Sequence, residues 1–252
     1  MRCSRLTHVW RFGGWLVLLW AVSLSVWAQS RPLDLASAAD RLELRDHLSI
    51  LHDPSTDWLP LQAMAQEGWR GATEQSLHPG LISAAIWLRV ELYNSGTEQL
   101  TRWLSLGNPR LEHAHLYRID GQGLSGPQRS GLAYPPPVSI SSGRDALFEI
   151  TLPPGEHWLV LLRVESRTAI GLNPQLWEPQ AYLVQEEADD LRYLAPIGLM
   201  LGLVLYLLAN TLALGNRVLF LFALLILMGT LYDFAFYGYF RRYLMPAGGD
   251  LA

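Results

Sequence analysis

Two long apolar stretches near the carboxyl end constrain this chain more than any other feature. They cover residues 194–214 and 218–236, and each is long enough to cross a bilayer as a helix of about 20 residues. Only Gly215, Asn216 and Arg217 lie between them, so the two helices must form a tight hairpin. We therefore predict a membrane protein in which everything before residue 194 lies on one side of the bilayer.

The amino-terminal segment indicates which side that is. Arginines precede an apolar run over residues 12–26, and small residues near its end suit a signal peptidase. We predict a signal peptide over residues 1–28, cleaved after Ala28. An uncleaved anchor helix is the alternative, because several tryptophans make the run bulky. Both interpretations place the middle of the chain outside the cytoplasm.

Composition excludes two classes of function for the exported part. Cys3 is the only cysteine and leaves with the signal peptide, so neither disulfides nor thiolate metal sites remain after processing. The formal net charge is −4 and the basic residues are spread thinly. A nucleic-acid partner is therefore not expected.

The exported region carries the alternating pattern of β-strands. Residues 86–92 alternate between core-type and more polar side chains, and the pattern returns at 148–152 and 158–164. Turn sequences separate these runs, for example Asn94-Ser95-Gly96. The pattern predicts a mainly β fold, a β-sandwich over residues 29–178. We also expect one early helix, capped by Ser55 or Asp57 and running through Met64.

From Pro179 the periodicity becomes helical. Tyr182 lies on the predicted apolar side, whereas Glu186 and Asp189 lie on the predicted solvated side. We predict a helical stalk over residues 179–193, then the two transmembrane helices over 194–240 and a short tail over 241–252. The stalk fits a simple spacer and a signal-carrying lever equally well.

Two motifs suggest a bound cofactor or metal but lack the required context. Residues 121–126 match G-x-G-x-x-G, yet no helical period follows, so they predict a hairpin connection and no dinucleotide site. His113 and His115 would point the same way along a strand, but a third metal ligand has no evident source among neighbours such as Glu112 or His157. We predict neither a cofactor nor a metal.

Catalytic patterns are weak as well. The sequence contains no G-x-S-x-G elbow. Glu91, Glu149 and Glu165 lie on predicted strands, where carboxylates more often face water or pair with arginines such as Arg163 than act as an acid–base pair. We therefore predict no catalytic residues and a non-catalytic chain.

Tryptophans are the best candidates for ligand contacts, because flat rings stack on the apolar faces of sugars. Trp158 falls on a core face, and Trp87 should pack against a helix or a second sheet. Trp69, Trp103 and Trp177 remain as candidate ligand-binding residues. Packing in the core or at its rim is the alternative for each of them.

The membrane helices contain two further candidates. Gly198 and Gly202 have the G-x-x-x-G spacing that allows close approach of another helix, either the hairpin partner or one outside this chain. Asp233 is an acid in a membrane span, with a structural and a functional interpretation both open. Arg241 and Arg242 should lie outside, which opposes the usual excess of positive charge inside; we follow the signal peptide.

The ordered pieces of the chain resemble a known family. Asp53-Pro54 precedes a short helix, Trp87-Leu88-Arg89-Val90-Glu91-Leu92 closes on Asn94, and Leu161-Leu162-Arg163-Val164 leads to Leu176-Trp177-Glu178-Pro179 before the hairpin. This resembles bacterial seven-transmembrane receptors with diverse intracellular signalling modules, those with the second type of extracellular domain.

The resemblance implies a periplasmic jelly-roll domain, similar to carbohydrate-binding modules, on the bacterial inner membrane. It implies a small-molecule ligand, with carbohydrate among the candidates, and a signal passed through a bundle of seven helices. Output in that family comes from a cytoplasmic kinase or a diguanylate cyclase. This chain carries two of the helices, as a truncated gene, a fragment or half of a split receptor would.

Two rival functions belong to other classes. The first is a membrane-tethered carbohydrate-binding or scaffolding domain that needs no partner helices. The second is a periplasmic glycan hydrolase that would use Glu91 or Glu149. Co-purification of a separate helical subunit with the chain would favour the receptor over both rivals.

The predicted topology can be tested directly in cells. Because an even number of crossings returns the chain to its starting side, a phosphatase reporter at Ala252 should be active in the periplasm. Protease added to spheroplasts should cleave near Gly131. A reporter active only in the cytosol, with Gly131 protected, would contradict the prediction.

Overall fold

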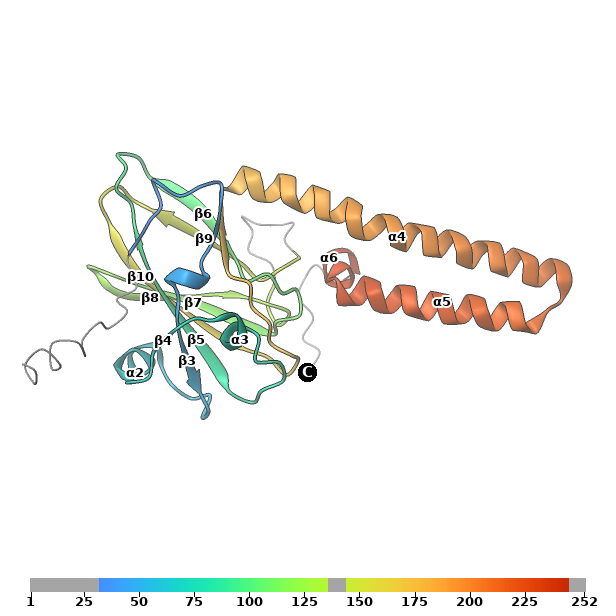
Figure 1. Ribbon diagram of the computed structural model, residues 1–252, viewed down its shortest axis with the longest axis horizontal. Coiled ribbons are helices and arrows are strands. Elements are labelled where there is room, and N and C mark those ends of the chain that lie inside the picture. Colours follow the sequence, from blue (N-terminus) through green and yellow to red (C-terminus); the bar gives the residue numbers. More distant parts are fainter. Residues whose placement is uncertain (1–31, 136–143, 245–252) are drawn as a thin grey trace, which may run out of the picture.

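The computed structural model describes residues 32–135 and 144–244. The predicted signal peptide over residues 1–28, its cleavage site and the end of the predicted tail lie outside the described residues. The described chain forms a β-sandwich followed by a long helical hairpin (Figure 1). The prediction of a mainly β domain followed by a helical hairpin is therefore confirmed.

The described strands form two sheets with the main core between them, and every pairing is antiparallel except that of β1 with β5. Neighbouring strands of the larger sheet are β4 (Arg70–Gly71), β3 (Ser49–Asp53), β5 (Ala85–Tyr93), β10 (His157–Glu165), β7 (His113–Asp120) and β8 (Gly123–Ser130), with β1 (Leu33–Asp34) beside β5. Those of the smaller sheet are β2 (Arg41–Glu43), β11 (Gln175–Trp177), β6 (Leu100–Ser105) and β9 (Leu147–Leu152).

The three runs with alternating side chains form β5, β9 and β10, and one face of each strand is turned toward the core, as predicted. On β5, the side chains of Ile86, Leu88, Val90 and Leu92 are at most 1% exposed. They meet the inward side chains of the smaller sheet, among them Phe148 on β9. Burial of this apolar surface is the main favourable contribution to folding of the sandwich.

A loop covers the outer face of the larger sheet. Trp87 is fully buried there and packs with Leu51, Ala63 and Leu161, which confirms that it packs against a helical segment. Ala63 belongs to the short helix α2 (Pro60–Ala65). Other short helices precede β3 and follow β4, namely η1 (Arg45–His47) and α3 (Glu74–Leu77).

The predicted cap of α2 is wrong, although the helix exists. The Ser55 hydroxyl donates to Asp53 Oδ1 at 2.6 Å and so closes the preceding turn. The helix begins at Pro60, and the Gln62 side chain accepts a hydrogen bond from the Leu59 backbone at 2.9 Å. Pro60 suits the first helical position because its missing N–H would have no helical partner there.

The G-x-G-x-x-G motif forms a β-hairpin, as predicted. Gly121 and Gln122 make the turn between β7 and β8, and Gly123 to Gly126 continue into β8. The Asp120 side chain accepts a hydrogen bond from the Gln122 backbone at 2.8 Å, which stabilises the turn.

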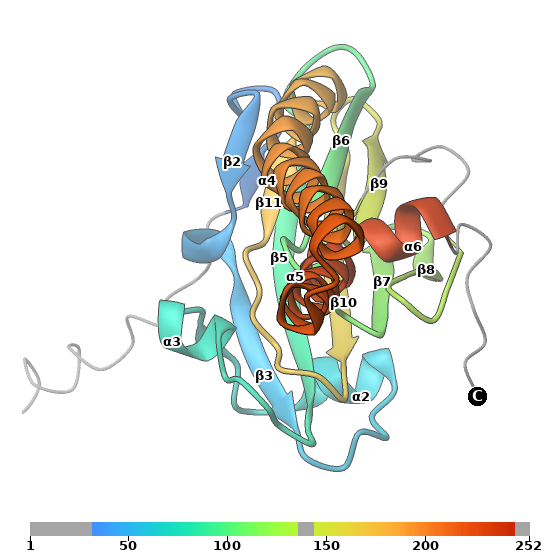
Figure 2. The same ribbon diagram turned by 90° about the vertical axis from the view of Figure 1, so that its right-hand side faces the viewer.

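The predicted hairpin consists of α4 (Pro179–Leu214) and α5 (Arg217–Phe236), both long and apolar enough to cross a membrane. Gly215 ends α4 in the left-handed conformation, and the Asn216 side chain caps α5 by accepting from the Val218 backbone at 2.9 Å. Figure 2 looks toward this hairpin with the sandwich behind it.

The segment after α5 differs from the predicted tail. A further helix, α6 (Tyr239–Leu244), covers its first residues and folds back beside the sandwich. Gly238, with φ of 83°, makes the bend, and an added Cβ there would lie 2.8 Å from Pro109 Cβ. Only a residue without a side chain fits this close approach.

The stalk continues into the membrane helix without a break, so residues 179–193 form the first part of α4. At about 1.5 Å per residue, the 36 residues of α4 extend roughly 54 Å, well beyond the hydrocarbon core of a bilayer. The prediction of a solvated Glu186 is wrong, because this side chain is buried at the junction between the sandwich and the hairpin.

Candidate functional site

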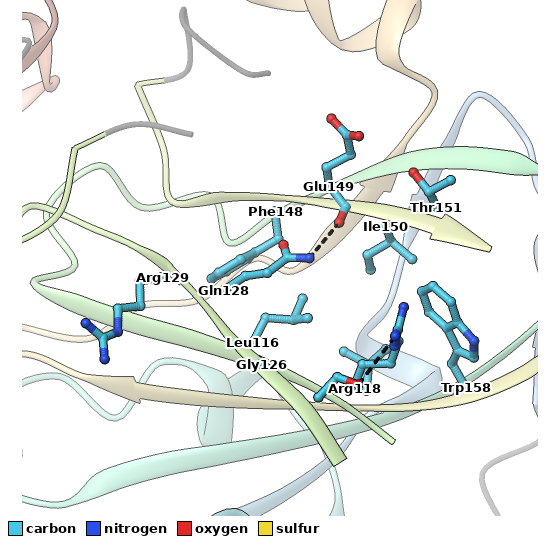
Figure 3. A pocket seen from close by; sticks show the side chains of 12 residues that line it. Leu116, Arg118, Gly126, Gln128, Arg129, Phe148, Glu149, Ile150, Thr151 and Trp158 are labelled. Carbon is cyan, nitrogen blue, oxygen red and sulfur yellow. Dashed lines mark hydrogen bonds between the residues drawn. The ribbon is translucent and has the colours of Figure 1, made fainter. Parts of the chain in front are cut away.

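A cavity of about 550 Å³ lies between the edge strands of the two sheets, β8 and β9 (Figure 3). Its volume falls in the range of small-molecule sites. The inner faces of four strands line it, and its lining includes Leu116, Arg118, Ser125, Gln128, Phe148 and Trp158. Such a mixture of aromatic floor and a few polar groups is typical of ligand pockets.

Arg118 is the charged side chain that points into this cavity (Figure 3). It follows Ala114 and Leu116 on the inward side of β7, where an apolar residue would be usual. Its guanidinium lies 4.4 Å from the centre of the Trp158 ring, and its Nε lies 3.0 Å from Asp120 Oδ2. Stacking and pairing therefore hold the guanidinium in one place.

The other charged residues at the rim face away from the cavity. In Figure 3 the Glu149 carboxylate and the Arg129 guanidinium both point outward. Arg129 instead lies over the ring of Tyr134, at 5.7 Å from its centre. The electrostatic character of the cavity is thus set mainly by Arg118.

Two hydrogen bonds join the edge strands beside the cavity. Gln128 Nε2 donates to the Glu149 carbonyl at 3.3 Å, and the Leu147 backbone N–H donates to Ser130 Oγ at 3.2 Å. These bonds link β8 to β9 without a continuous ladder. A ligand between the strands would contact both of them.

A second cavity, of about 330 Å³, lies where α4 meets the sandwich. Here Tyr182 of α4 is buried against Trp103, Trp177 and Leu147, with edge-to-face contacts to both indole rings at 5.7 and 5.8 Å. Leu147 belongs to β9. The strand that lines the first cavity therefore also holds the base of α4.

Charged side chains reinforce this junction. Arg144, just before β9, lies 3.4 Å from Asp189 Oδ2 of α4. Arg242 of α6 donates to Asp190 Oδ2 at 2.8 Å, and the Tyr239 hydroxyl donates to Asp190 Oδ1 at 3.0 Å. Arg144, Asp189, Asp190, Tyr239 and Arg242 are named here the junction network. It joins the sandwich, α4 and α6.

Asp145 borders the same junction. Burial raises the pKa of its carboxyl above the ordinary value, against the opposing charge of Arg144 and a hydrogen bond from the Ser105 hydroxyl at 3.2 Å. Burial likewise raises the pKa of the neighbouring Tyr182 hydroxyl. The junction is thus poorly solvated, and its charges interact more strongly than they would in water.

The three predicted ligand-contact tryptophans lie apart from the first cavity. Trp103 and Trp177 are 9% and 7% exposed and pack at the junction, where Trp177 also lines the second cavity. Trp69 donates from Nε1 to the Ala63 carbonyl at 3.1 Å and carries Arg89 above its ring, so it anchors α2. Trp158 is in the core, as predicted.

The predicted membrane residues occupy exposed positions. Gly198 and Gly202 border a shallow apolar depression on α4, and a Cβ added to either meets nothing within 4 Å among the described residues. The partner helix α5 therefore does not fill this face. The Asp233 side chain is exposed near the end of α5.

The two histidines of β7 share one hydroxyl. His113 Nδ1 and His115 Nε2 lie 3.2 and 2.8 Å from Tyr134 Oη. Burial lowers the pKa of His115 to about 4, so its ring is neutral at neutral pH. Within residues 32–135 and 144–244, no group of three or more His, Cys, Asp or Glu side chains is placed to hold a metal ion.

The glutamates considered for catalysis lie separately. Glu165 pairs with Arg163 at 2.8 Å, as predicted, and Glu91 is exposed on β5. Arg118, Gln128 and Phe148 are residues of the cavity that were not predicted as ligand contacts. For Arg118, the alternation along β7 contained a clue. Ala114, Leu116 and Arg118 are two residues apart, so their side chains lie on the same, inward face of the strand.

Comparison with known families decides the identity of the sandwich. Residues 45–178, more than half of the chain, match the family described as 7TMR-DISM extracellular 2. The chain belongs to this family. The 7TMR-DISM extracellular 2 domain is an extracellular sensor domain of membrane receptors, and here it precedes two helices able to cross a membrane. Among curated proteins, none matches this chain.

The raised pKa of Asp145 predicts a specific pH dependence. A native pKa above the unfolded value, about 3.9, means that the folded chain binds the proton more tightly. This carboxyl therefore lowers the stability as the pH rises from about 4 through its native pKa. Asp145→Asn should flatten that decline in thermal melts of the full chain in detergent.

Glu187→Gln, which changes an exposed acid on α4, is the matched control and should follow the unmodified chain. A decline of the same size in Asp145→Asn and the unmodified chain would contradict the assignment.

Proposed function

We propose that this chain is the ligand-sensing and transmembrane part of a bacterial receptor, non-catalytic itself, with its sandwich in the periplasm and its hairpin in the inner membrane. The cavity between β8 and β9 binds a small molecule, with carbohydrates among the candidates. The observation that carries the proposal is the double role of β9. Phe148 and Ile150 line the cavity on its inner face, while Leu147 packs on Tyr182 at the base of α4.

The signal follows from this geometry. A ligand that changes the separation of β8 and β9 also moves Leu147 and the adjoining Arg144, because both are on or next to the strand. The junction network then shifts the base of α4, and the helix transmits the shift as a rigid body. In this account the segment 179–193 acts as a lever.

The membrane part supplies the next contact. The open face around Gly198 and Gly202 accepts another transmembrane helix, because small residues allow two helix backbones to approach closely. A cytoplasmic kinase or diguanylate cyclase module then produces the output. Co-purification of a separate helical subunit with the full chain would support this arrangement over a simple tethered binding domain.

The site can be tested by filling it. Ser125 points toward Arg118 from β8, whereas the preceding residue, Leu124, is 42% exposed on the opposite side of the strand. The full chain in detergent is screened by thermal shift against sugars, nucleotides and carboxylates. At least one compound should raise the melting point of the unmodified chain and of Leu124→Trp, but not of Ser125→Trp.

A compound that stabilises all three proteins equally would place the ligand elsewhere. If no compound raises any melting point, the sensory function loses its support and a structural role gains.

A further inference from the structure

The cavity between β8 and β9 contains a feature that a site for neutral sugars would not require. Arg118 projects a guanidinium between two sheets whose inner faces are otherwise largely apolar. Moving a charged group out of bulk water costs free energy unless partners compensate it. The contacts of the guanidinium with neighbouring residues show which of its nitrogens already face a partner.

Two of the three guanidinium nitrogens face a protein partner, but only one of them donates a hydrogen bond. Nη2 donates to Ser125 Oγ at 3.3 Å, whereas Nε lies 3.0 Å from Asp120 Oδ2 as an ion pair without hydrogen-bond geometry. Within the described chain, no residue hydrogen-bonds to Nη1. In Figure 3 the guanidinium lies beside Trp158, directed into the cavity. One edge of the guanidinium thus remains available to an incoming group.

The groups around this edge determine which ligand it accepts. Trp158 and Phe148 offer apolar ring surface, and Gln128 offers an amide at the far side. Two nearby acids lie outside the lining and have partners of their own: Asp120 pairs with Arg118, and Glu156 accepts from Trp158 Nε1 at 2.7 Å. Glu149 directs its carboxylate outward. A ligand therefore meets one cationic group above aromatic surface.

We propose that the cavity binds a small organic carboxylate, with its carboxylate on the free edge of the Arg118 guanidinium and its ring or carbon skeleton on Trp158 and Phe148. This inference deepens the proposed sensory function and rests on it. Guanidinium and carboxylate form short, charge-assisted hydrogen bonds in a planar geometry. Sugar acids and aromatic acids both carry the required group, and the experiment separates them.

Matched pairs of compounds test the charge. Isothermal titration of the full chain in detergent compares glucuronate with glucose and benzoate with benzamide. In at least one pair, the acid should bind at least about tenfold more tightly than its neutral partner. Its affinity should also fall as the salt concentration rises. The pair that responds identifies a sugar acid or an aromatic acid as the source.

Matched variants test the residue. Arg118→Gln should weaken binding of the acid by about 10- to 100-fold and leave the neutral compound unchanged. Arg129→Gln is the control, because this neighbouring arginine points away from the cavity. Arg118→Lys keeps the charge without the planar fork and should fall between the two. Thermal melts of each variant establish that it is folded.

The outcomes distinguish this inference from the function on which it rests. The acid and its neutral partner could bind equally well, with binding unaffected by Arg118→Gln but blocked by Ser125→Trp. That result would overturn the preference for a carboxylate and leave the proposed sensory cavity in place. Should neither pair bind, while another compound of the thermal-shift screen stabilises the unmodified chain but not Ser125→Trp, the carboxylate would be overturned and the cavity retained. Preference for the acid that survives Arg118→Gln would also contradict the role of Arg118.

Discussion

The packing of Tyr182 against Trp103, Trp177 and Leu147 is the contact on which the rest of the molecule depends. It joins a sheet stabilised by its own core to a helix that can cross a membrane. Aromatic contacts of this kind contribute about 0.5–1.5 kcal/mol each beyond the area they bury. In the proposed receptor, these contacts are what allow a change in the sandwich to reach α4.

The charges around this contact give the junction a defined geometry. The aromatic cluster can tolerate small rotations, whereas the junction network fixes direction because Arg144 and Arg242 approach the acids of α4 from two elements. Partly buried ion pairs add little net stability but strongly disfavour arrangements that leave one charge unpaired. Such a junction favours a small number of discrete positions for the helix, which suits a switch.

Much of the fold could be predicted from the sequence because its signals are local. The alternation on β5, β9 and β10, the length of the apolar helices and the Gly215-Asn216 turn each depend on a few neighbouring residues. The cap of α2 was predicted incorrectly, since Ser55 closes a turn with Asp53 instead. The helix instead begins after Leu59, whose backbone N–H donates to the Gln62 side chain, so neither predicted residue caps it.

The candidate site could not be predicted for a different reason. It depends on the adjacency of β8 and β9, edge strands of different sheets, and no local pattern encodes that pairing. The burial of Glu186 likewise depends on α6 and the sandwich, which are distant in sequence. Trp103 and Trp177, chosen as ligand contacts, lie at the junction instead. The local sequence could not show this, because a tryptophan that stacks on a ligand and one that is buried in a core have the same local pattern.

Electron-spin distance measurements test the central claim, that β9 couples the cavity to α4. Nitroxides replace exposed Glu91 on β5 and exposed Glu187 on α4, in a Cys3→Ser chain reconstituted in nanodiscs. A carboxylate shown to bind in the cavity should shift the distance distribution, and Tyr182→Ala should abolish the shift while the compound still binds. Identical distributions with and without the bound compound in the unmodified junction would contradict the account.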